Sequence, residues 1–252
     1  MQTDSGHNDW LTKDRSETDK NRMSERTTYN GIIVSNPALG INVYNNGISA
    51  ESCKAAIHTL ESKLTNSTSP VYKWQGAMVT ESDSVMSDAR DCVDFKISSS
   101  AYGPRDSENS ELYDMHKNIF DAIHPNVQDY GSYWGVGISY YEAFNFVKYE
   151  GAGKHFNIHA DHGPAYVTTV SVVAYLNDDY EGGELYFPRF NLTIKPKQGD
   201  VLVFPSTYIY EHASLPMKNG TKYSVVVMTD YNDRGGLRFF PYRQEDSNKL
   251  TY

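Results

Sequence analysis

Three residues of this sequence have the types and the spacing of a metal-binding site. His159 and Asp161 are separated by one residue, and His212 follows later in the chain. In an extended segment, residues i and i+2 project from the same face, so His159 and Asp161 can point at one ion. Two imidazoles and one carboxylate can hold an octahedral metal on one face and leave the opposite face open. The pattern predicts such a site, although a lone His-x-Asp often arises by chance.

Lys222 is the next residue whose position suggests chemistry. It falls in a segment that alternates between two faces, and one face carries Lys222, Ser224, Val226 and Met228. A lysine on the inner face of an apolar strand needs an anion, because a buried unpaired ammonium group is costly. The carboxylate of a co-substrate would supply that anion. The alternative is an edge lysine whose ammonium group reaches solvent, and for Lys222 taken alone this alternative is the simpler one.

The same histidines allow other interpretations. His155 and His159 are four residues apart, as in helical zinc proteases, but those enzymes need a Glu directly after the first His, and Phe156 stands there. We expect His155 and His162 to be surface residues or neighbours of the site. A different metal in a cupin-like site fits the three ligands but leaves Lys222 unexplained.

The elements that position these residues are expected to be mainly strands. Residues 167–176 alternate between a polar face able to line a cavity, with Thr169, Ser171 and Tyr175, and an apolar core face. Many short strands separated by Gly, Pro and Asn favour a sandwich or jelly roll. The expected strands are 136–149, 167–176, 185–187, 192–195, 201–204 and 223–229, with one or two more in 31–44.

The first half of the chain predicts supporting elements without catalytic residues. Ser49 has the position of an N-cap for a helix that runs to about Leu64. Ser110 is expected to cap a second helix, which should stop near Pro125. Between them, residues 93–97 alternate as in a half-buried strand.

Length and composition fit one globular domain. The chain has 252 residues, and 20 tyrosines contribute to an aromatic content of 13%, which is ample for a core and an aromatic cleft. We expect residues 1–29 to be a polar, loosely held N-terminal arm and residues 30–252 to be a single domain. Cys53 and Cys92 form no CxxC pair and are expected to be reduced, packed thiols.

Charge and hydropathy restrict the partners. The net charge of −9 argues against a general binder of nucleic acid or of anionic membranes. No apolar run reaches the roughly 18 residues of a membrane span. The N-terminal sequence has no apolar segment typical of a secretion signal, so we expect a cytoplasmic, intracellular protein.

Taken together, the motifs resemble the prolyl 4-hydroxylase-like branch of the 2-oxoglutarate/Fe(II)-dependent dioxygenases. The run from Tyr149 through Gly153 and Phe156 to His159 and Asp161 is similar to its tyrosine-glycine-aromatic-HxD signature. Its further motifs are matched by Tyr175-Leu176-Asn177, by Gly182-Gly183 through Phe187, and by Gly199-Asp200, Phe204, His212, Pro216, Gly220 and Lys222. The match covers about residues 140–230, where four motifs occur in the family's order.

The resemblance implies a mainly β (α+β) fold, a double-stranded β-helix of the jelly-roll, cupin-like type, braced by N-terminal α-helices. It implies His159, Asp161 and His212 as iron ligands and as the catalytic centre. Lys222 would pair with the distal carboxylate of 2-oxoglutarate. The hydroxyl groups expected beside this co-substrate are those of Tyr149, Tyr175 and, as a weaker candidate, Ser224. The implied cofactors are Fe(II), 2-oxoglutarate and O2, with ascorbate as an accessory reductant to be tested.

The substrate end departs from the family pattern. Prolyl hydroxylases of this branch commonly carry an Arg where Thr168 stands and a Trp where Met228 stands. We expect hydroxylation of a C–H bond, with a peptide, protein or small molecule as substrate and peptidyl proline as the leading single guess. The alternative is a non-catalytic, metal-binding jelly-roll module. An oxygenase that had lost its activity would be expected to lose Lys222 or a metal ligand first, and this sequence retains all of them.

Overall fold

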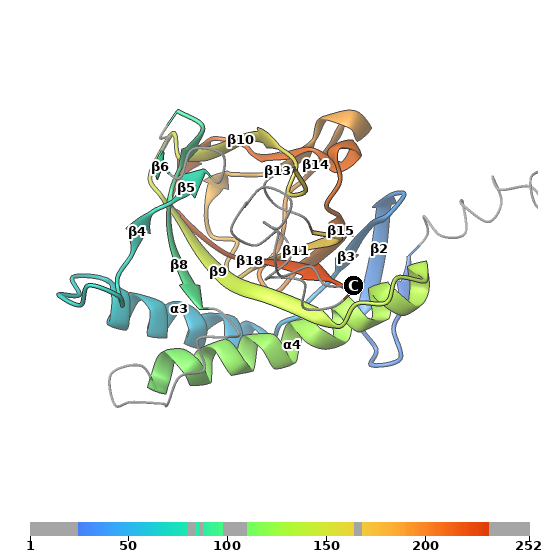
Figure 1. The fold of residues 1–252 in the computed structure, drawn as a ribbon, viewed down its shortest axis with the longest axis horizontal. Coiled ribbons are helices and arrows are strands. Elements are labelled where there is room, and N and C mark those ends of the chain that lie inside the picture. Colours follow the sequence, from blue (N-terminus) through green and yellow to red (C-terminus); the bar gives the residue numbers. More distant parts are fainter. Residues whose placement is uncertain (1–24, 80–83, 86–87, 98–109, 164–167, 232–252) are drawn as a thin grey trace, which may run out of the picture.

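Two antiparallel sheets enclose a cavity, and two helices cover the outer face of the larger sheet (Figure 1). The computed structural model describes residues 25–79, 84–85, 88–97, 110–163 and 168–231. This arrangement is the double-stranded β-helix that the sequence predicts, and the site lies between the sheets.

The larger sheet supplies the floor of the cavity. All of its neighbouring strands pair antiparallel. In spatial order they are β1 (Arg26–Thr27), β2 (Ile33–Ala38), β3 (Ile41–Tyr44), β15 (Val201–Pro205), β11 (Val170–Tyr175), β18 (Thr221–Asp230), β9 (Tyr140–Glu150), β8 (Val93–Ile97) and β4 (Gln75–Gly76).

The smaller sheet forms the opposite wall, at the top of the view in Figure 1. Its order is β14 (Leu192–Ile194), β13 (Leu185–Phe187), β16 (His212–Ser214), β10 (His155–His159) and β7 (Arg90–Asp91). Two short ribbons and two 3-10 turns complete the described elements: β12 (Glu181–Gly182) with β17 (Met217–Asn219), β5 (Met78–Val79) with β6 (Ser84–Val85), η2 (Pro188–Phe190) and η3 (Tyr208–Tyr210).

Helices α3 (Ala50–Leu64) and α4 (Ser110–Trp134) pack side by side below the larger sheet (Figure 1). Ser49 caps α3 as predicted, and its side chain accepts a hydrogen bond from the Ser52 backbone N–H at 3.1 Å. Cys53, a free thiol, faces the core. Neither of these described helices is long and apolar enough to span a bilayer.

The alternation predicted for β11 is confirmed. Val170, Val172 and Ala174 are buried in the core that the helices cover. Val173 and Tyr175 project to the other side and line the cavity. The strand therefore separates a structural face from a functional face.

The expected helix stop at Pro125 is wrong, because α4 continues through it to Trp134. Proline removes one backbone hydrogen bond from a helix interior and usually kinks or breaks the helix. Here Val127 and Tyr130 extend the buried stripe of α4 beyond the proline, which favours continuation. The Asn126 side chain adds a hydrogen bond to the Ala122 carbonyl at 3.0 Å.

The expected arm over residues 1–29 also needs correction at its C-terminal end. β1 pairs with β2, so Arg26 and its neighbour Thr27 belong to the sheet. Arg26 Nη1 donates to Asp129 Oδ1 of α4 at 3.0 Å, and its guanidinium lies 4.3 Å from the Tyr133 ring centroid. Residues 1–24 lie outside the described part of the chain.

Candidate active site

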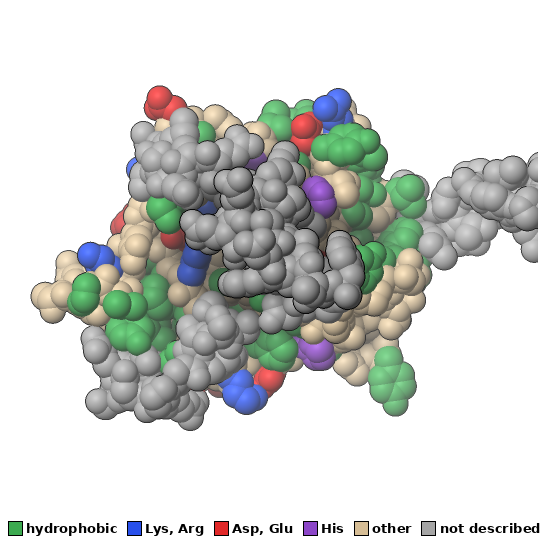
Figure 2. Space-filling view, in the orientation of Figure 1, with side chains coloured by type: hydrophobic (Ala, Val, Ile, Leu, Met, Phe, Trp, Pro, Cys, Tyr) green, Lys and Arg blue, Asp and Glu red, His purple; other side chains and the backbone are tan. Residues whose placement is uncertain are grey.

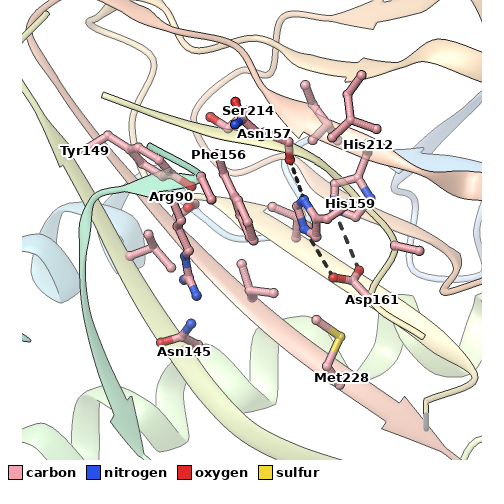
Figure 3. A pocket seen from close by; sticks show the side chains of 18 of the residues that line it. Arg90, Asn145, Tyr149, Phe156, Asn157, His159, Asp161, His212, Ser214 and Met228 are labelled. Atoms are coloured by element: carbon pink, nitrogen blue, oxygen red, sulfur yellow. Dashed lines mark hydrogen bonds and ion pairs between the residues drawn. The ribbon is translucent and has the colours of Figure 1, made fainter. Parts of the chain in front are cut away.

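His159, Asp161 and His212 converge at one end of the cavity (Figure 3). His159 ends β10 and His212 begins β16, and these residues are direct partners in the antiparallel pairing of the two strands. The distance from His159 Nε2 to Asp161 Oδ1 is 3.5 Å, and that from His212 Nε2 to Asp161 Oδ2 is 3.8 Å. One potential ligand atom from each residue lies within 4.8 Å of the others, which suits a single ion.

Hydrogen bonds set the orientation of both imidazoles. His159 Nδ1 lies 2.8 Å from the Asn157 carbonyl, and His212 Nδ1 lies 3.1 Å from the Tyr210 carbonyl. Because a carbonyl oxygen only accepts, each Nδ1 carries the proton and donates it. In the neutral tautomer that donates from Nδ1, Nε2 is the atom with the lone pair, and in both residues Nε2 faces Asp161. This donor set fits a metal ion, whose histidine ligands usually donate their second N–H in this way.

The protonation states also suit a metal. Burial alone would raise the pKa of Asp161, but the imidazoles of His212 and His159 and the Ser171 hydroxyl lower this pKa to about 2. Ser171 Oγ donates to Asp161 Oδ2 at 2.6 Å. Burial lowers the pKa of His212 to about 4. At neutral pH the site therefore offers a carboxylate and a neutral His212, the forms that bind metal ions.

Lys222 occupies the inner end of the cavity. Its side chain is among the largest that are fully buried, and its Nζ donates to the Gly183 carbonyl at 2.8 Å and to Ser214 Oγ. No carboxylate of the described residues lies within ion-pair distance of Nζ. Burial lowers the pKa of Lys222 to about 7. The inner-face position predicted from the alternation is confirmed, and the snorkelling alternative does not describe this lysine.

The three predicted hydroxyl residues line the same cavity: Tyr149, Tyr175 and Ser224. Tyr149 is the strand partner of Lys222, and Tyr175 is the strand partner of Ser224. Burial raises the pKa of both tyrosine hydroxyls, so both stay protonated and can donate hydrogen bonds. Cys92, a buried free thiol, belongs to the apolar cluster that packs around Tyr149.

The cavity that joins the two ends has a volume of about 590 Å³. This is within the usual range for small-molecule sites. Ala143, Asn145 and Met228 line it as well, at positions along β9 and β18 away from Lys222. The wall of the cavity therefore extends well past Lys222 and its strand partner Tyr149.

The described surface beside the site is partly apolar. Figure 2 shows hydrophobic side chains, in green, among the described residues toward the upper right of the molecule. Tyr208 and Ile209 of η3 are exposed, with relative accessibilities of 69% and 47%. Because η3 comes just before His212 in the chain, this surface borders the strand that carries a candidate ligand.

The two other histidines near the site bind backbone carbonyls, and the two positions at which the sequence departs from the family pattern, Thr168 and Met228, differ in their surroundings. His155 Nδ1 bonds the Gly153 carbonyl and His162 Nδ1 bonds the Thr168 carbonyl, and neither histidine belongs to the metal-ligating group. Thr168 is buried and donates its hydroxyl to the Thr229 carbonyl at 3.1 Å. Met228 lines the cavity.

Some cavity residues were not predicted. Ser214, which accepts a hydrogen bond from Lys222, follows His212 by two positions on β16, so the same-face rule would have found it. Arg90 and Asn145 also line the cavity. Their approach depends on the pairing of β7 with β10 and of β8 with β9, for which the local sequence gives no signal.

Comparison with known families finds a match within this part of the chain. Residues 144–229 match the family described as the 2OG-Fe(II) oxygenase superfamily. The match shows that this segment is similar to that superfamily. The matched segment contains His159, Asp161, His212 and Lys222, and it coincides closely with the 140–230 span of the motifs. Iron, 2-oxoglutarate and O2 are therefore the cofactors that the family implies.

Similar proteins extend the comparison. A PKHD-type hydroxylase of Prochlorococcus marinus is 31% identical over 105 residues, which cover 39% of this chain and 43% of that protein. The match thus spans less than half the length of this relative.

Solved prolyl hydroxylases share the fold. A Trichoplax adhaerens prolyl hydroxylase, solved with a hypoxia inducible factor peptide fragment, has a TM-score of 0.63 and 17% identity, covering 79% of this chain and 86% of that one. A Pseudomonas putida prolyl-4-hydroxylase has a TM-score of 0.52 and 19% identity, covering 75% and 91%. The predicted likeness to prolyl 4-hydroxylase-like oxygenases is confirmed.

Proposed function

We propose that the protein is an Fe(II)- and 2-oxoglutarate-dependent dioxygenase that hydroxylates a C–H bond of its substrate. The observation that carries this proposal is the buried Lys222 in the same cavity as the His159–Asp161–His212 group. A metal site alone fits many functions. A metal site that shares its cavity with a buried lysine, which has no carboxylate partner among the described residues, fits a ligand that binds metal at one end and carries an anion at the other.

His159, Asp161 and His212 would hold the iron, and Lys222 would hold the distal carboxylate of 2-oxoglutarate. When bound, iron supplies the chemistry by which O2 and 2-oxoglutarate convert a substrate C–H into C–OH, with succinate and CO2 as the other products. Lys222 contributes a charge-assisted hydrogen bond that orients the co-substrate. The protonated hydroxyls of Tyr149 and Tyr175 line the same space and can donate to its oxygens.

Burial gives these contacts their strength. Lys222, Ser224, Tyr149 and Tyr175 are all buried, so they are shielded from bulk solvent and a bound ligand would make its hydrogen bonds in a low-dielectric environment. The Gly183 carbonyl and Ser214 hydroxyl hold Nζ in place before any ligand arrives. A preorganised cation of this kind binds an anion without first reorganising its surroundings.

For the substrate, we propose a peptide or small molecule that enters along Asn145 and Met228, with peptidyl proline as the first candidate. Support comes from the fold shared with prolyl hydroxylases. The absence of Arg at position 168 and of Trp at position 228 argues for recognition that differs from simple proline-rich peptides.

A direct test is to incubate the protein with Fe(II), 2-oxoglutarate and a peptide or lysate library. Succinate release together with products heavier by one oxygen atom, detected by mass spectrometry, is the expected result. Ascorbate is included in one arm as an accessory reductant. Binding of metal and 2-oxoglutarate without succinate in any arm would instead favour a non-catalytic metal-binding module.

A further inference from the structure

Three side chains form a stack that reaches from β7 to the metal-binding group. In Figure 3, Phe156 lies between Arg90 and His159. The Phe156 and His159 rings are stacked, with centroids 3.6 Å apart and an interplanar angle of 17°. The Arg90 guanidinium carbon lies 4.8 Å from the Phe156 centroid. The three groups come from adjacent strands, because Arg90 and Phe156 are direct partners in the β7–β10 pairing.

We propose that Phe156 and Arg90 are positioning residues that fix the plane of the His159 imidazole for metal binding. This inference rests on the proposed metal site at His159, Asp161 and His212. Neither Phe156 nor Arg90 offers a ligand atom to that group.

His159 needs such support more than His212 does. The side chain of His159 is 22% exposed, whereas that of His212 is 7% exposed. The His212 ring is enclosed by Phe187 and Phe204, with centroids 5.7 Å and 4.9 Å away. For His159 the hydrogen bond from Nδ1 to the Asn157 carbonyl fixes one atom of the ring. The stacked Phe156 supplies the second constraint, which prevents the ring from tilting about that bond.

Arg90 in turn fixes Phe156. Its Nη1 donates to the Met78 carbonyl at 3.0 Å and its Nη2 donates to Asp94 Oδ2 at 3.3 Å, and its side chain is buried. A guanidinium anchored at two points presents a rigid face to the Phe156 ring. Asp94 balances its charge, so the stack adds no net positive charge beside a bound dication.

The stack should stabilise the metal-bound state more than the metal-free state. Coordination draws electron density from the His159 imidazole and makes the ring more cation-like. A cation-like ring is attracted more strongly to the negative face of Phe156. An interaction that is stronger in the bound state raises the affinity for the metal.

The test is a titration of the metal-free protein with Co(II), followed by its visible absorption. Phe156→Leu should weaken Co(II) binding by about two- to ten-fold, the range expected from one aromatic pair, and change the Co(II) spectrum. Arg90→Met should weaken binding by about two- to five-fold, as for a partly buried cation–π contact. Phe156→Tyr keeps the ring and should restore both the affinity and the spectrum.

The chain offers matched controls. Phe120→Leu removes a remote Phe–His stack on α4, where the Phe120 and His124 centroids are 5.3 Å apart at 21°. Arg26→Met removes the cation–π contact with Tyr133. Both controls should keep the wild-type Co(II) constant, even where thermal unfolding shows a loss of stability.

Wild-type affinity and an unchanged spectrum in folded Phe156→Leu would overturn the positioning role while leaving the metal site intact. Equal weakening in the Phe120→Leu control would also overturn it, because the effect would then be one of general stability. Failure of the wild-type protein to bind Co(II) would instead remove the metal site itself, and the proposed function with it.

Discussion

Lys222 and Tyr149 face each other across the pairing of β18 and β9, and Lys222 Nζ lies 4.2 Å from the Tyr149 ring centroid. The ring face attracts the ammonium group without neutralising it. Nζ therefore remains available to bind an anion although it is buried, and a bound anion would favour its charged form.

Replacing Lys222 should weaken co-substrate binding. A charge-assisted hydrogen bond contributes about 1.5–3 kcal/mol, so Lys222→Met should raise the apparent 2-oxoglutarate constant by roughly ten- to a hundred-fold. Lys154→Met is the matched control, because Lys154 pairs with Asp91 at 2.8 Å. Initial rates of succinate formation measure both constants. An unchanged constant in Lys222→Met would place the anion elsewhere.

The same lysine should make stability depend on pH. Its folded pKa of about 7 lies below the ordinary value of 10.5, so the folded state binds fewer protons than the unfolded state between these values. Without ligand, the free energy of unfolding should therefore rise with pH from about 7 to 10.5.

Lys222→Met removes this dependence. The variant should be more stable than the wild type below pH 7, where the buried charge is fully present, and the difference should shrink at alkaline pH. Thermal unfolding of both metal-free proteins across the pH range is the measurement. Parallel curves would show that Lys222 does not titrate in this window.

The metal ligands are tested by direct substitution. His159→Ala and His212→Ala should each weaken Co(II) binding by more than about ten- to a hundred-fold, because even residues that only orient ligands contribute that much. Succinate formation should be lost in both. His155→Ala is the control, since His155 lies outside the group. Substantial turnover in either ligand variant would remove that residue from the ligand set.

A side chain at position 183 should disturb Lys222 by steric contact, in addition to straining the backbone. Its φ is +66°, and an added Cβ would lie 2.5 Å from Met217 Sδ and 3.2 Å from Lys222 Nζ. Gly183→Ala should therefore raise the 2-oxoglutarate constant and reduce stability. Gly151→Ala is the control, because Gly151 has a φ of +87° with no atom within 4 Å of the added Cβ. Backbone strain of about 1–2 kcal/mol is expected in both variants, but the constant should change only at Gly183.

Simple proline-rich peptides should be poor substrates. Met228 lines the cavity without the rigid wall of a Trp, and the Thr168 hydroxyl is already bonded to the Thr229 carbonyl. We expect little 4-hydroxyproline in poly-proline or collagen-like peptides, while metal and 2-oxoglutarate bind normally. Amino acid analysis after incubation decides this. Efficient product formation would show that other residues at the mouth recognise the peptide.

Two of the three candidate metal ligands and the inner-face position of Lys222 could be predicted from local rules, whereas His212 was predicted from the order of the motifs. His159 and Asp161 share a face of an extended segment, and Lys222 falls on the polar side of an otherwise apolar strand. The helix after Ser49 was predictable for the same reason, since its cap and its apolar stripe are both local.

Other features depend on distant pairing. Arg90 reaches the cavity only because β7 pairs with β10, and no periodicity in its own segment reports this. At Pro125 the local rule predicted a helix end, but burial of Val127 and Tyr130 outweighed it. The preference of the local sequence to end the helix therefore gave a wrong prediction, because the tertiary packing of the continued helix supplied the larger free energy.

β18 carries Lys222 near one end and Met228 near the other, with both side chains on the cavity face. At about 3.3 Å per residue the two positions are roughly 20 Å apart along the strand. If the proposed roles hold, we expect substitutions at Met228 to change which substrate is accepted without weakening the binding of 2-oxoglutarate at Lys222. A single residue inserted between Lys222 and Met228 would have a larger effect. Because side chains alternate between the two faces of a strand, the insertion would move either Lys222 or Met228 from the cavity face to the opposite face. A point substitution at Met228 would therefore act at one end of the cavity alone, whereas a change in strand length would alter both ends.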